Sequence, residues 1–261
     1  MRVPPGKSKT NYLRMKNVFL LLLLVFASFQ LSTGLVSAQT PSEILKRMDE
    51  VLLQAGDQTS NVRMVMVDRN GNERIREATI WQKGGEKRLF RFTSPASEAG
   101  IAFLSLPDDL MYLYLPAFGR ERRIAAHLKN QNFAGTDFTY EDLEVRRYSE
   151  TFSGTILRQE GNLIVMELRP LPGIISDYSR TIVSVNRTNF LPEKTEAFDR
   201  GGNLVKSAVY SWVRRDGFWY PQEIHMRDLR RGSSTRMLMT EVRFNTNLSD
   251  QIFTVRNLTR F

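Results

Sequence analysis

The sequence predicts a mainly β protein of the α+β class: an open, strongly curved antiparallel β-barrel capped by two or three helices. Three observations support this fold class. Apolar and polar residues alternate with a period of two over most of the chain after residue 56. Turns rich in glycine and asparagine separate these stretches at hairpin length, so that neighbouring strands run antiparallel. Helical spacing is confined to a few short segments. The alternating stretches number about eleven or twelve, and we expect each of them to form a strand.

Residues 1–38 have the features of a secretory signal peptide. Five basic residues and no acid precede or flank a 12-residue apolar run at 18–29, and Ser37 and Ala38 favour cleavage after Ala38. The alternative is an uncleaved membrane anchor, which a run of 12 residues disfavours because a spanning helix needs roughly 20. The sequence therefore predicts a cleaved signal peptide, 1–38, followed by a single domain, 39–261.

Composition excludes several classes of function. Without residues 1–38 the net charge falls from +9 to 32 − 28 = +4, which does not argue for nucleic-acid binding. The absence of cysteine excludes disulfides, a thiolate metal site, a cysteine nucleophile and a lipid-modified cysteine. His127 and His225 lie nearly 100 residues apart, and the chain contains no serine-hydrolase or phosphate-loop motif. We therefore expect no metal site and no catalytic residue.

The first element of the domain is a helix. Thr40 and Glu43 form a capping box around Pro41 at the first helical position, and apolar residues recur on one face from Ile44 onward. Gly56 is expected to end this helix in a left-handed conformation.

Strands occupy most of the remaining chain. Residues 61–92 divide into three strands at the turns formed by residues 70–71 and 84–85. Further strands are expected at 101–106, 110–115, 150–159, 163–170, 180–186, 192–199, 204–213, 219–228 and 234–245. Ser249 is then expected to cap a short terminal helix.

The strands at 101–106 and 110–115 are apolar on both faces. One face of a half-exposed strand is ordinarily polar, so we expect one face of this pair to meet a helix and the other to face the barrel interior. Seven methionines also fall on expected strands, where they suit either an irregular core or a surface that adapts to apolar ligands. The candidates for a cavity wall are Met64, Met66, Phe90, Phe92, Phe103, Leu113, Trp212, Met237 and Met239. A slip of one residue in register would reverse each assignment.

The stretch FAGTDFTYEDL, residues 133–143, lies between the two series of strands and admits two interpretations. A paired-carboxylate hydrolase could use Asp137, Glu141 and Asp142. A structural role is favoured, because Thr139 and Asp142 fit a second capping box and acids are stabilised in the first turn of a helix. We therefore expect a short helix near Tyr140.

Three segments are expected to form a lid over the barrel: the N-terminal helix, residues 133–146 and the loop at 171–178. Phe133, Phe138 and Leu143 would anchor the second segment on apolar surface, and Gly135 would supply a permissive backbone. The lid candidates are Phe133, Gly135, Thr136, Asp137, Phe138, Tyr140, Ile174 and Ile175, the last two forming an apolar loop tip.

Two basic clusters, at 119–124 and 227–231, are typical of solvated loops or strand ends. If they dock, they would make transient contact with an anionic membrane surface or an acidic partner.

Two motifs in order, LYLPAFGRERRI at 113–124 and FAGTDFTYEDL at 133–143, resemble the outer-membrane lipoprotein-sorting protein family, the LolA-like branch of the LolA/LolB-type fold. The similarity extends from about Ser42 to the C-terminus. The resemblance implies an unclosed antiparallel barrel of about eleven strands whose helices cover a hydrophobic cavity. It implies a periplasmic, non-enzymatic carrier, without a cofactor, for the acyl chains of a lipid or lipoprotein. It also implies a partnership with an inner-membrane lipid exporter of the resistance-nodulation-division type.

Two other classes of function remain open. The protein could be a non-catalytic adaptor or scaffold of an envelope transporter, with no cargo of its own. It could also be the carboxylate-dependent hydrolase considered above.

Overall fold

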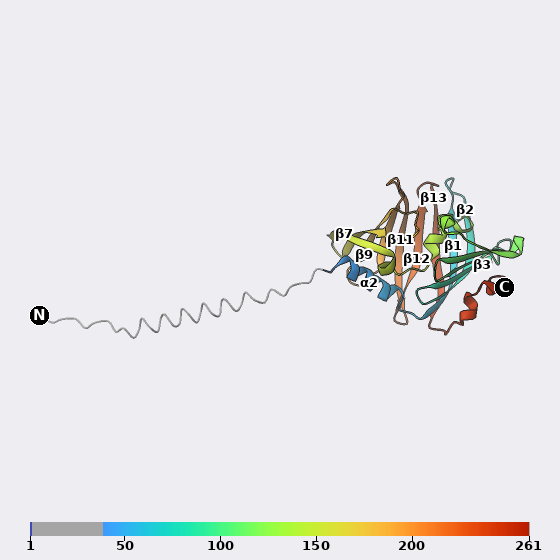
Figure 1. Ribbon diagram of the computed structural model, residues 1–261, viewed down its shortest axis with the longest axis horizontal. Coiled ribbons are helices and arrows are strands. Elements are labelled where there is room, and N and C mark those ends of the chain that lie inside the picture. The colour runs from blue at the N-terminus through green and yellow to red at the C-terminus, as the bar shows by residue number, and fades with distance from the viewer. Residues whose placement is uncertain (2–38, 261) are drawn as a thin grey trace. The chain divides into compact units, whose positions relative to one another are not determined.

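The computed structural model describes residue 1 and residues 39–260, so the predicted signal peptide lies outside the described residues except for Met1. The folded unit, Thr40–Phe261, is built on one antiparallel sheet of 13 strands, counted over the part of the chain that is described (Figure 1). This confirms an open, curved antiparallel sheet with a few helices.

The bounds of the elements follow the chain. The first strands are β1 (Asp57–Val67), β2 (Glu73–Lys83), β3 (Lys87–Ser94), β4 (Ala102–Leu106), β5 (Leu110–Leu115) and β6 (Arg120–Arg123). The later strands are β7 (Phe152–Glu160), β8 (Leu163–Pro170), β9 (Arg180–Asn186), β10 (Pro192–Phe198), β11 (Leu204–Arg215), β12 (Phe218–Asp228) and β13 (Ser233–Phe244). The α-helices are α2 (Pro41–Leu52), α3 (Tyr140–Leu143), α4 (Tyr148–Thr151) and α5 (Val255–Leu258). The 3₁₀ helices are η2 (Pro116–Phe118), η3 (Ala126–Leu128), η4 (Phe133–Gly135) and η5 (Asp250–Phe253).

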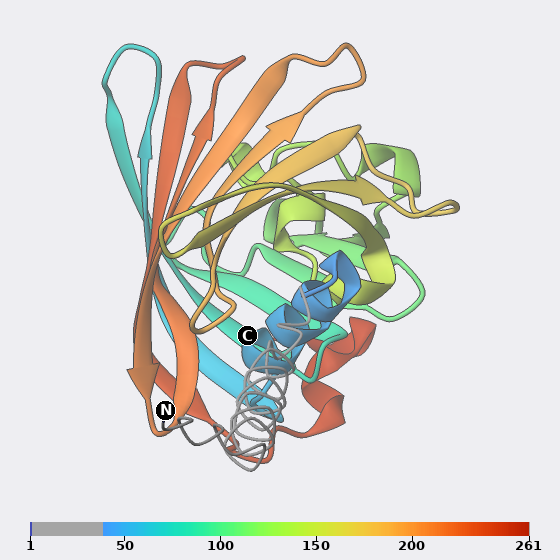
Figure 2. The same ribbon diagram turned by 90° about the vertical axis from the view of Figure 1, so that its left-hand side faces the viewer.

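The two edge strands of the sheet follow each other along the chain. The order is β6-β5-β4-β3-β2-β1-β13-β12-β11-β10-β9-β8-β7, so β1 pairs with β13 in the middle of the sheet. The edge strands β6 and β7 are joined by residues 124–151, which we call the strap. Figure 2 shows the bent sheet with α2 (blue) and the strap (green to yellow-green) on its inner side.

Local sequence signals explain the helices well. The capping boxes Thr40–Glu43 and Thr139–Asp142 both form, and Ser249 caps η5, as predicted. The expected role of Gly56 is wrong: α2 ends at Leu52, and Gly56 is not in the left-handed region. Its N–H donates instead to the side-chain oxygen of Asn245 at 2.8 Å, immediately before β1 begins.

Among the described strands, β6 is the one that the sequence pattern missed. All four of its residues are exposed, so the pattern carries no alternation. A charged, short strand at a sheet edge discourages pairing with other chains. The cluster at 119–124 is therefore an edge strand that follows a left-handed Gly119.

The apolar strands β4 and β5 have both faces covered, as predicted. Their inner residues, including Phe103 and Met111, join the core on the concave side of the sheet. Their outer residues, including Leu104 and Tyr114, pack with Phe253 and Leu258 of the C-terminal helices. Near the β7 edge of the sheet, Ile44, Leu45 and Met48 of α2 cover β8 and β9. The strand residues of this third cluster are Ile164, Met166, Leu168, Val183 and Val185.

Candidate functional site: an apolar cavity beneath the strap

A cavity of about 310 Å³ lies between the concave face of the sheet and the strap. Its floor comes from β11, β12 and β13 and includes Ala208, Ile224, Met237 and Met239. Its roof comes from the strap and from the end of α2, with Leu52, Leu53, Leu143, Val145 and Tyr148 among the lining residues.

Alternation along β11 directs one side of the strand into the cavity. Lys206, Ala208, Tyr210 and Trp212 line it, and Ser207 also borders it, whereas Val209 does not and is 50% exposed. The neighbouring β12 lines the cavity with residues 219 and 221 and then with 224 and 226. A β-bulge opposite residues 211–212 of β11 causes this change of parity, since an extra residue reverses which side chains face inward.

The structure places the nine predicted wall residues in two groups. Trp212, Met237 and Met239 line the cavity. The other six are absent from its lining: Met64, Phe90, Phe92 and Phe103 are buried in the concave core, Leu113 packs against that core, and Met66 is buried on β1.

Phe133 of the strap fills the other half of the concave face. Its side chain is fully buried, and its ring stacks on Phe92 with centroids 5.3 Å apart and meets Phe90 edge-on at 5.2 Å. Phe103 and Tyr140 complete this aromatic cluster. Such aromatic pairs add stability beyond the area that they bury. Phe133 therefore fills part of the concave face, and the cavity takes up space beside it that is lined mainly by β9–β13 and also by Ile80, Gln82 and Arg88 of β2 and β3.

A reversal of the backbone carries Phe133 into the core. Ala134 and Gly135 have φ values of 46° and 77°, a left-handed region that glycine tolerates and alanine adopts at a cost. The Arg76 guanidinium donates to the Ala134 carbonyl, and the Thr136 hydroxyl donates to the Phe133 carbonyl at 2.8 Å. Gly135 therefore supplies the permissive backbone that the sequence predicted.

Asp137 fixes this part of the strap to β13. Its buried carboxylate accepts hydrogen bonds from Thr235 at 2.7 Å, from Ser233, and from Arg231 at 3.3 Å. Lys206 donates to the Asp137 carbonyl at 2.6 Å. Arg231 of the basic cluster 227–231 therefore binds the strap within the same molecule.

Glu141 and Asp142 link α3 to the loop at 171–178. Ser176 and the Asp177 N–H donate to Glu141, and the Tyr178 hydroxyl lies 3.1 Å from Asp142. Glu141 also pairs with Arg146 at 3.1 Å, and Asp142 pairs with Lys206 at 3.0 Å. The carboxylates considered for hydrolysis are therefore all engaged in holding the strap.

The tip of the loop at 171–178 is apolar and accessible. Ile174 and Ile175 are 37% and 48% exposed. The loop therefore connects an exposed apolar tip to the strap through Glu141 and Asp142.

Charged groups occupy part of the cavity wall. Burial raises the pKa of Glu144, although Arg146 and Lys129 oppose this effect. Desolvation lowers the pKa of Arg88 to about 10, which leaves its guanidinium protonated at neutral pH. Arg88 donates to the Leu143 carbonyl at 2.8 Å and to the Gln82 side chain at 2.6 Å. Arg88 therefore ties the inner face of the sheet to the strap.

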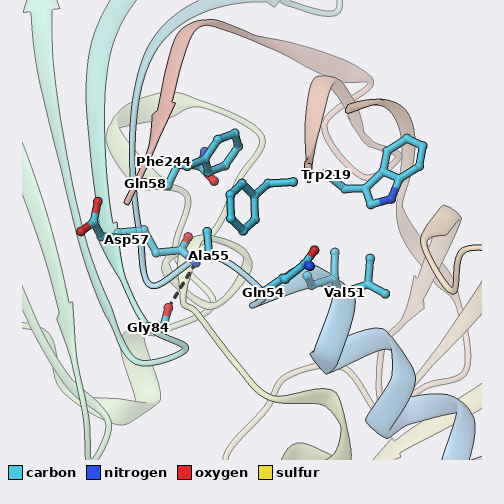
Figure 3. A pocket seen from close by; sticks show the side chains of 11 residues that line it. Val51, Gln54, Ala55, Asp57, Gln58, Gly84, Trp219 and Phe244 are labelled. Atoms are coloured by element: carbon cyan, nitrogen blue, oxygen red, sulfur yellow. Dashed lines mark hydrogen bonds between the residues drawn. The ribbon is translucent and has the colours of Figure 1, made fainter. Parts of the chain in front are cut away.

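A small pocket of about 10 Å³ adjoins the cavity near the C-terminal end of α2 (Figure 3). Gln54 and Ala55 face Trp219 and Phe244 across it, and Leu52, Gln58, Gln82 and Trp219 line both spaces. Its size suits about one water molecule.

Several lining residues were not predicted from the sequence. The alternation that selected Trp212 would also have found Tyr210, two residues earlier on the same face. Ile224 was hidden by the bulge in β12. Arg88 gave no signal as a wall residue, because a charged residue near a turn is typical of solvent exposure. Over the described residues no cluster of three His, Cys, Asp or Glu side chains could hold a metal.

None of the helices in the described part of the chain is long and apolar enough to cross a membrane.

Comparison with known proteins supplies the family. A family model described as an uncharacterized protein matches residues 84–260, more than half of the chain. No curated protein matches the chain. A DUF1329 family protein from Desulfovibrio piger is 25% identical, with a TM-score of 0.79 over 84% of this chain and 97% of that one.

Two further solved structures share the fold. An outer membrane lipoprotein-sorting protein domain from Vibrio parahaemolyticus is 27% identical, with a TM-score of 0.75 over 84% of this chain and 98% of that one. A LolA superfamily protein from Nitrosomonas europaea is 24% identical, with a TM-score of 0.70 over 83% of this chain and 98% of that one. The chain therefore belongs to the family that this model describes, and it is similar in fold to proteins of the lipoprotein-sorting and LolA type that its two motifs resemble.

Proposed function

We propose that the protein is a periplasmic carrier that binds the acyl chains of a lipid or lipoprotein in the cavity beneath the strap and ferries them between membranes. The observation that carries this proposal is the cavity itself, whose floor of Met237, Met239, Ile224 and Ala208 is apolar and faces the strap. Methionine side chains adapt to apolar ligands of varied shape. The similarity to lipoprotein-sorting proteins supports the same class of function.

The size of the cavity is consistent with a small apolar ligand. A volume of about 310 Å³ lies at the lower end of the roughly 300–1,000 Å³ typical of ligand pockets. Burying a chain of about 16 carbons at ~0.8 kcal/mol per methylene would contribute roughly 12 kcal/mol before ordering costs. A second chain would require the roof to move outward.

We expect the roof to move in sections. Residues 133–137 are fixed by the aromatic cluster and by buried hydrogen bonds to β13. The roof at 143–146 is held by the buried Leu143 side chain, by the Arg88–Leu143 hydrogen bond and by ion pairs of Glu144 and Arg146. Opening at this second section, together with the loop at 171–178, would admit and release an acyl chain.

A non-enzymatic role is part of the proposal. The carboxylate oxygens of Asp137, Glu141 and Asp142 accept hydrogen bonds or form ion pairs that hold the strap in place. A catalytic carboxylate needs to reach a substrate or a water molecule instead.

The proposal includes two partners. An inner-membrane lipid exporter of the resistance-nodulation-division type would supply or receive the cargo. The exposed arginines of β6, next to Phe118, which is 60% exposed, would make transient contact with an anionic membrane. No nucleic acid is involved.

Native mass spectrometry of protein purified gently from its host tests the proposal. We expect wild-type protein to carry a lipid adduct. Ala208→Phe fills the cavity and should lose the adduct, whereas Val209→Phe places the same side chain one residue away on the exposed side and should keep it. Thermal unfolding establishes that both variants are folded. Folded wild-type protein without lipid that co-purifies with a transporter would favour the adaptor, and an adduct retained by Ala208→Phe would contradict binding in this cavity.

A further inference from the structure

Arg88 differs from the other basic residues of the cavity wall. Three basic side chains line the cavity, and two of them have acidic partners: Lys206 pairs with Asp142, and Arg146 pairs with Glu141 and Glu144. Within the described residues, Arg88 forms no salt bridge, and its two acceptors are the neutral oxygens of Leu143 and Gln82. Its positive charge is therefore not balanced by a neighbouring carboxylate.

The donors of Arg88 are only partly used. A guanidinium carries five N–H donors in a planar fork, and Arg88 directs two of them to protein acceptors. Its Nε is buried and has no hydrogen-bond partner. Each terminal nitrogen has a second N–H that is not used in these two hydrogen bonds. The guanidinium can therefore donate two further hydrogen bonds to one anion.

Arg88 brings this charge to the part of the cavity wall that the β2–β3 hairpin forms. Arg88 is paired with Gln82 across the β2–β3 hairpin, close to the small pocket beneath α2. The apolar floor on β11–β13 borders the same space. An amphiphile could place its apolar tail against Met237 and Met239 and its polar head group beside Arg88 on the β2–β3 hairpin.

We propose that Arg88 forms a subsite for the anionic head group, an ionised carboxylate or phosphate, of the amphiphile whose tail occupies the cavity. This inference rests on the proposed carrier function and narrows its ligand to negatively charged lipids. An uncharged lipid would leave the cation without a counter-ion when the ligand excludes water, which is unfavourable in an apolar environment.

A displacement assay tests the inference. Protein expressed from the full-length gene is loaded with N-phenyl-1-naphthylamine, an uncharged apolar dye, and titrated with palmitate, hexadecyl phosphate or 1-hexadecanol. We expect the wild type to bind one or both anions at least about tenfold more tightly than the alcohol, as charge-assisted hydrogen bonds imply. Arg88→Gln should remove this preference, so that the ratio between the affinities for the anions and for 1-hexadecanol falls to about one, and Arg88→Lys should retain part of it.

Arg91→Gln is the matched control. Arg91 lies on the same strand, its Nε is also without a partner and desolvation also lowers its pKa, but it contacts Asn257 near the C-terminus and does not line the cavity. This variant should keep the wild-type preference for anions.

The assay separates the two proposals. Failure of all three ligands to displace the dye from folded wild-type protein would contradict the carrier function. Equal binding of the anions and the alcohol by the wild type would overturn only the Arg88 subsite, and this comparison holds even if Arg88→Gln does not fold. Palmitate and hexadecyl phosphate then distinguish a carboxylate head group from a phosphate one.

Discussion

Asp137 accepts hydrogen bonds from Thr235, Ser233 and Arg231 while being 2% exposed. Its place in an acid-rich motif suggested either catalysis or architecture. Because both side-chain oxygens are occupied by donors from β13 and the preceding turn, the structure favours architecture.

We predict that Asp137→Asn lowers the free energy of unfolding by about 3 kcal/mol, since charge-assisted hydrogen bonds contribute about 1.5–3 kcal/mol each and are not additive. Urea denaturation measures this loss. Glu160→Gln, at a site where the side chain is 58% exposed, should change stability by less than about 0.5 kcal/mol. A fully stable Asp137→Asn protein that has lost a hydrolytic activity would instead restore the hydrolase interpretation.

Asp57 gives the stability of the protein a defined dependence on pH. Burial raises the pKa of Asp57, but hydrogen bonds from the Leu248 and Thr246 N–H groups and from the Thr246 hydroxyl together lower it below its ordinary value of 3.8. The unfolded state therefore takes up the proton first as pH falls. The contribution of Asp57 is complete above the unfolded-state pKa and is lost as pH falls through the lowered folded-state pKa.

We expect Asp57→Asn to be less stable than wild type at neutral pH, with a difference that shrinks as pH falls below about 4. Urea titrations at a series of pH values measure the difference. A difference that is constant down to pH 2 would contradict a specific role for the ionised Asp57 carboxylate.

At the scale of elements, the C-terminal helices act as a cover for the outer face of β3–β5. Phe253 of η5 is 4% exposed and packs with Leu89, Leu104 and Tyr114. Without this cover an apolar sheet face would meet water.

We predict that Phe253→Ala destabilises the protein by about 3–5 kcal/mol, which is the usual cost of truncating a buried phenylalanine. Gln251→Ala, at an exposed position of the same element, should cost less than about 1 kcal/mol. Thermal and urea unfolding both report the change. A loss of less than about 1 kcal/mol for Phe253→Ala would mean that the C-terminal helices contribute little to the fold.

The elements also show what could be predicted from sequence. Helix starts depend on local hydrogen bonds, so the capping boxes at Thr40 and Thr139 predicted α2 and α3 correctly. Double-sided apolar patterns correctly identified the covered strands β4 and β5. Strand β6 has no apolar residue, and the bulge in β12 reverses its inward face without a local signal, so neither could be read from alternation.

At the scale of the whole molecule, the pairing of β1 with β13 determines the architecture. This pairing joins segments about 180 residues apart, as in the hydrogen bond between Asn61 and Glu241. It leaves β6 and β7 as the free edges, so the strap between them must cross the open side of the sheet. Contacts at such separation have no local signature, which is why the sequence predicted that Phe133 anchors a lid segment but not that its ring packs on Phe90, Phe92 and Phe103.

The most direct test of the carrier account is to map where a bound acyl chain lies. A palmitate analogue with a diazirine near its tail would be bound, photo-activated and located by peptide mass spectrometry. The account predicts labelling of the inner residues of β11 and β13, including Ala208, Met237 and Met239, that unlabelled palmitate competes away. Labelling confined to outward residues such as Val209, or to the exposed tip at Ile174 and Ile175, would contradict it.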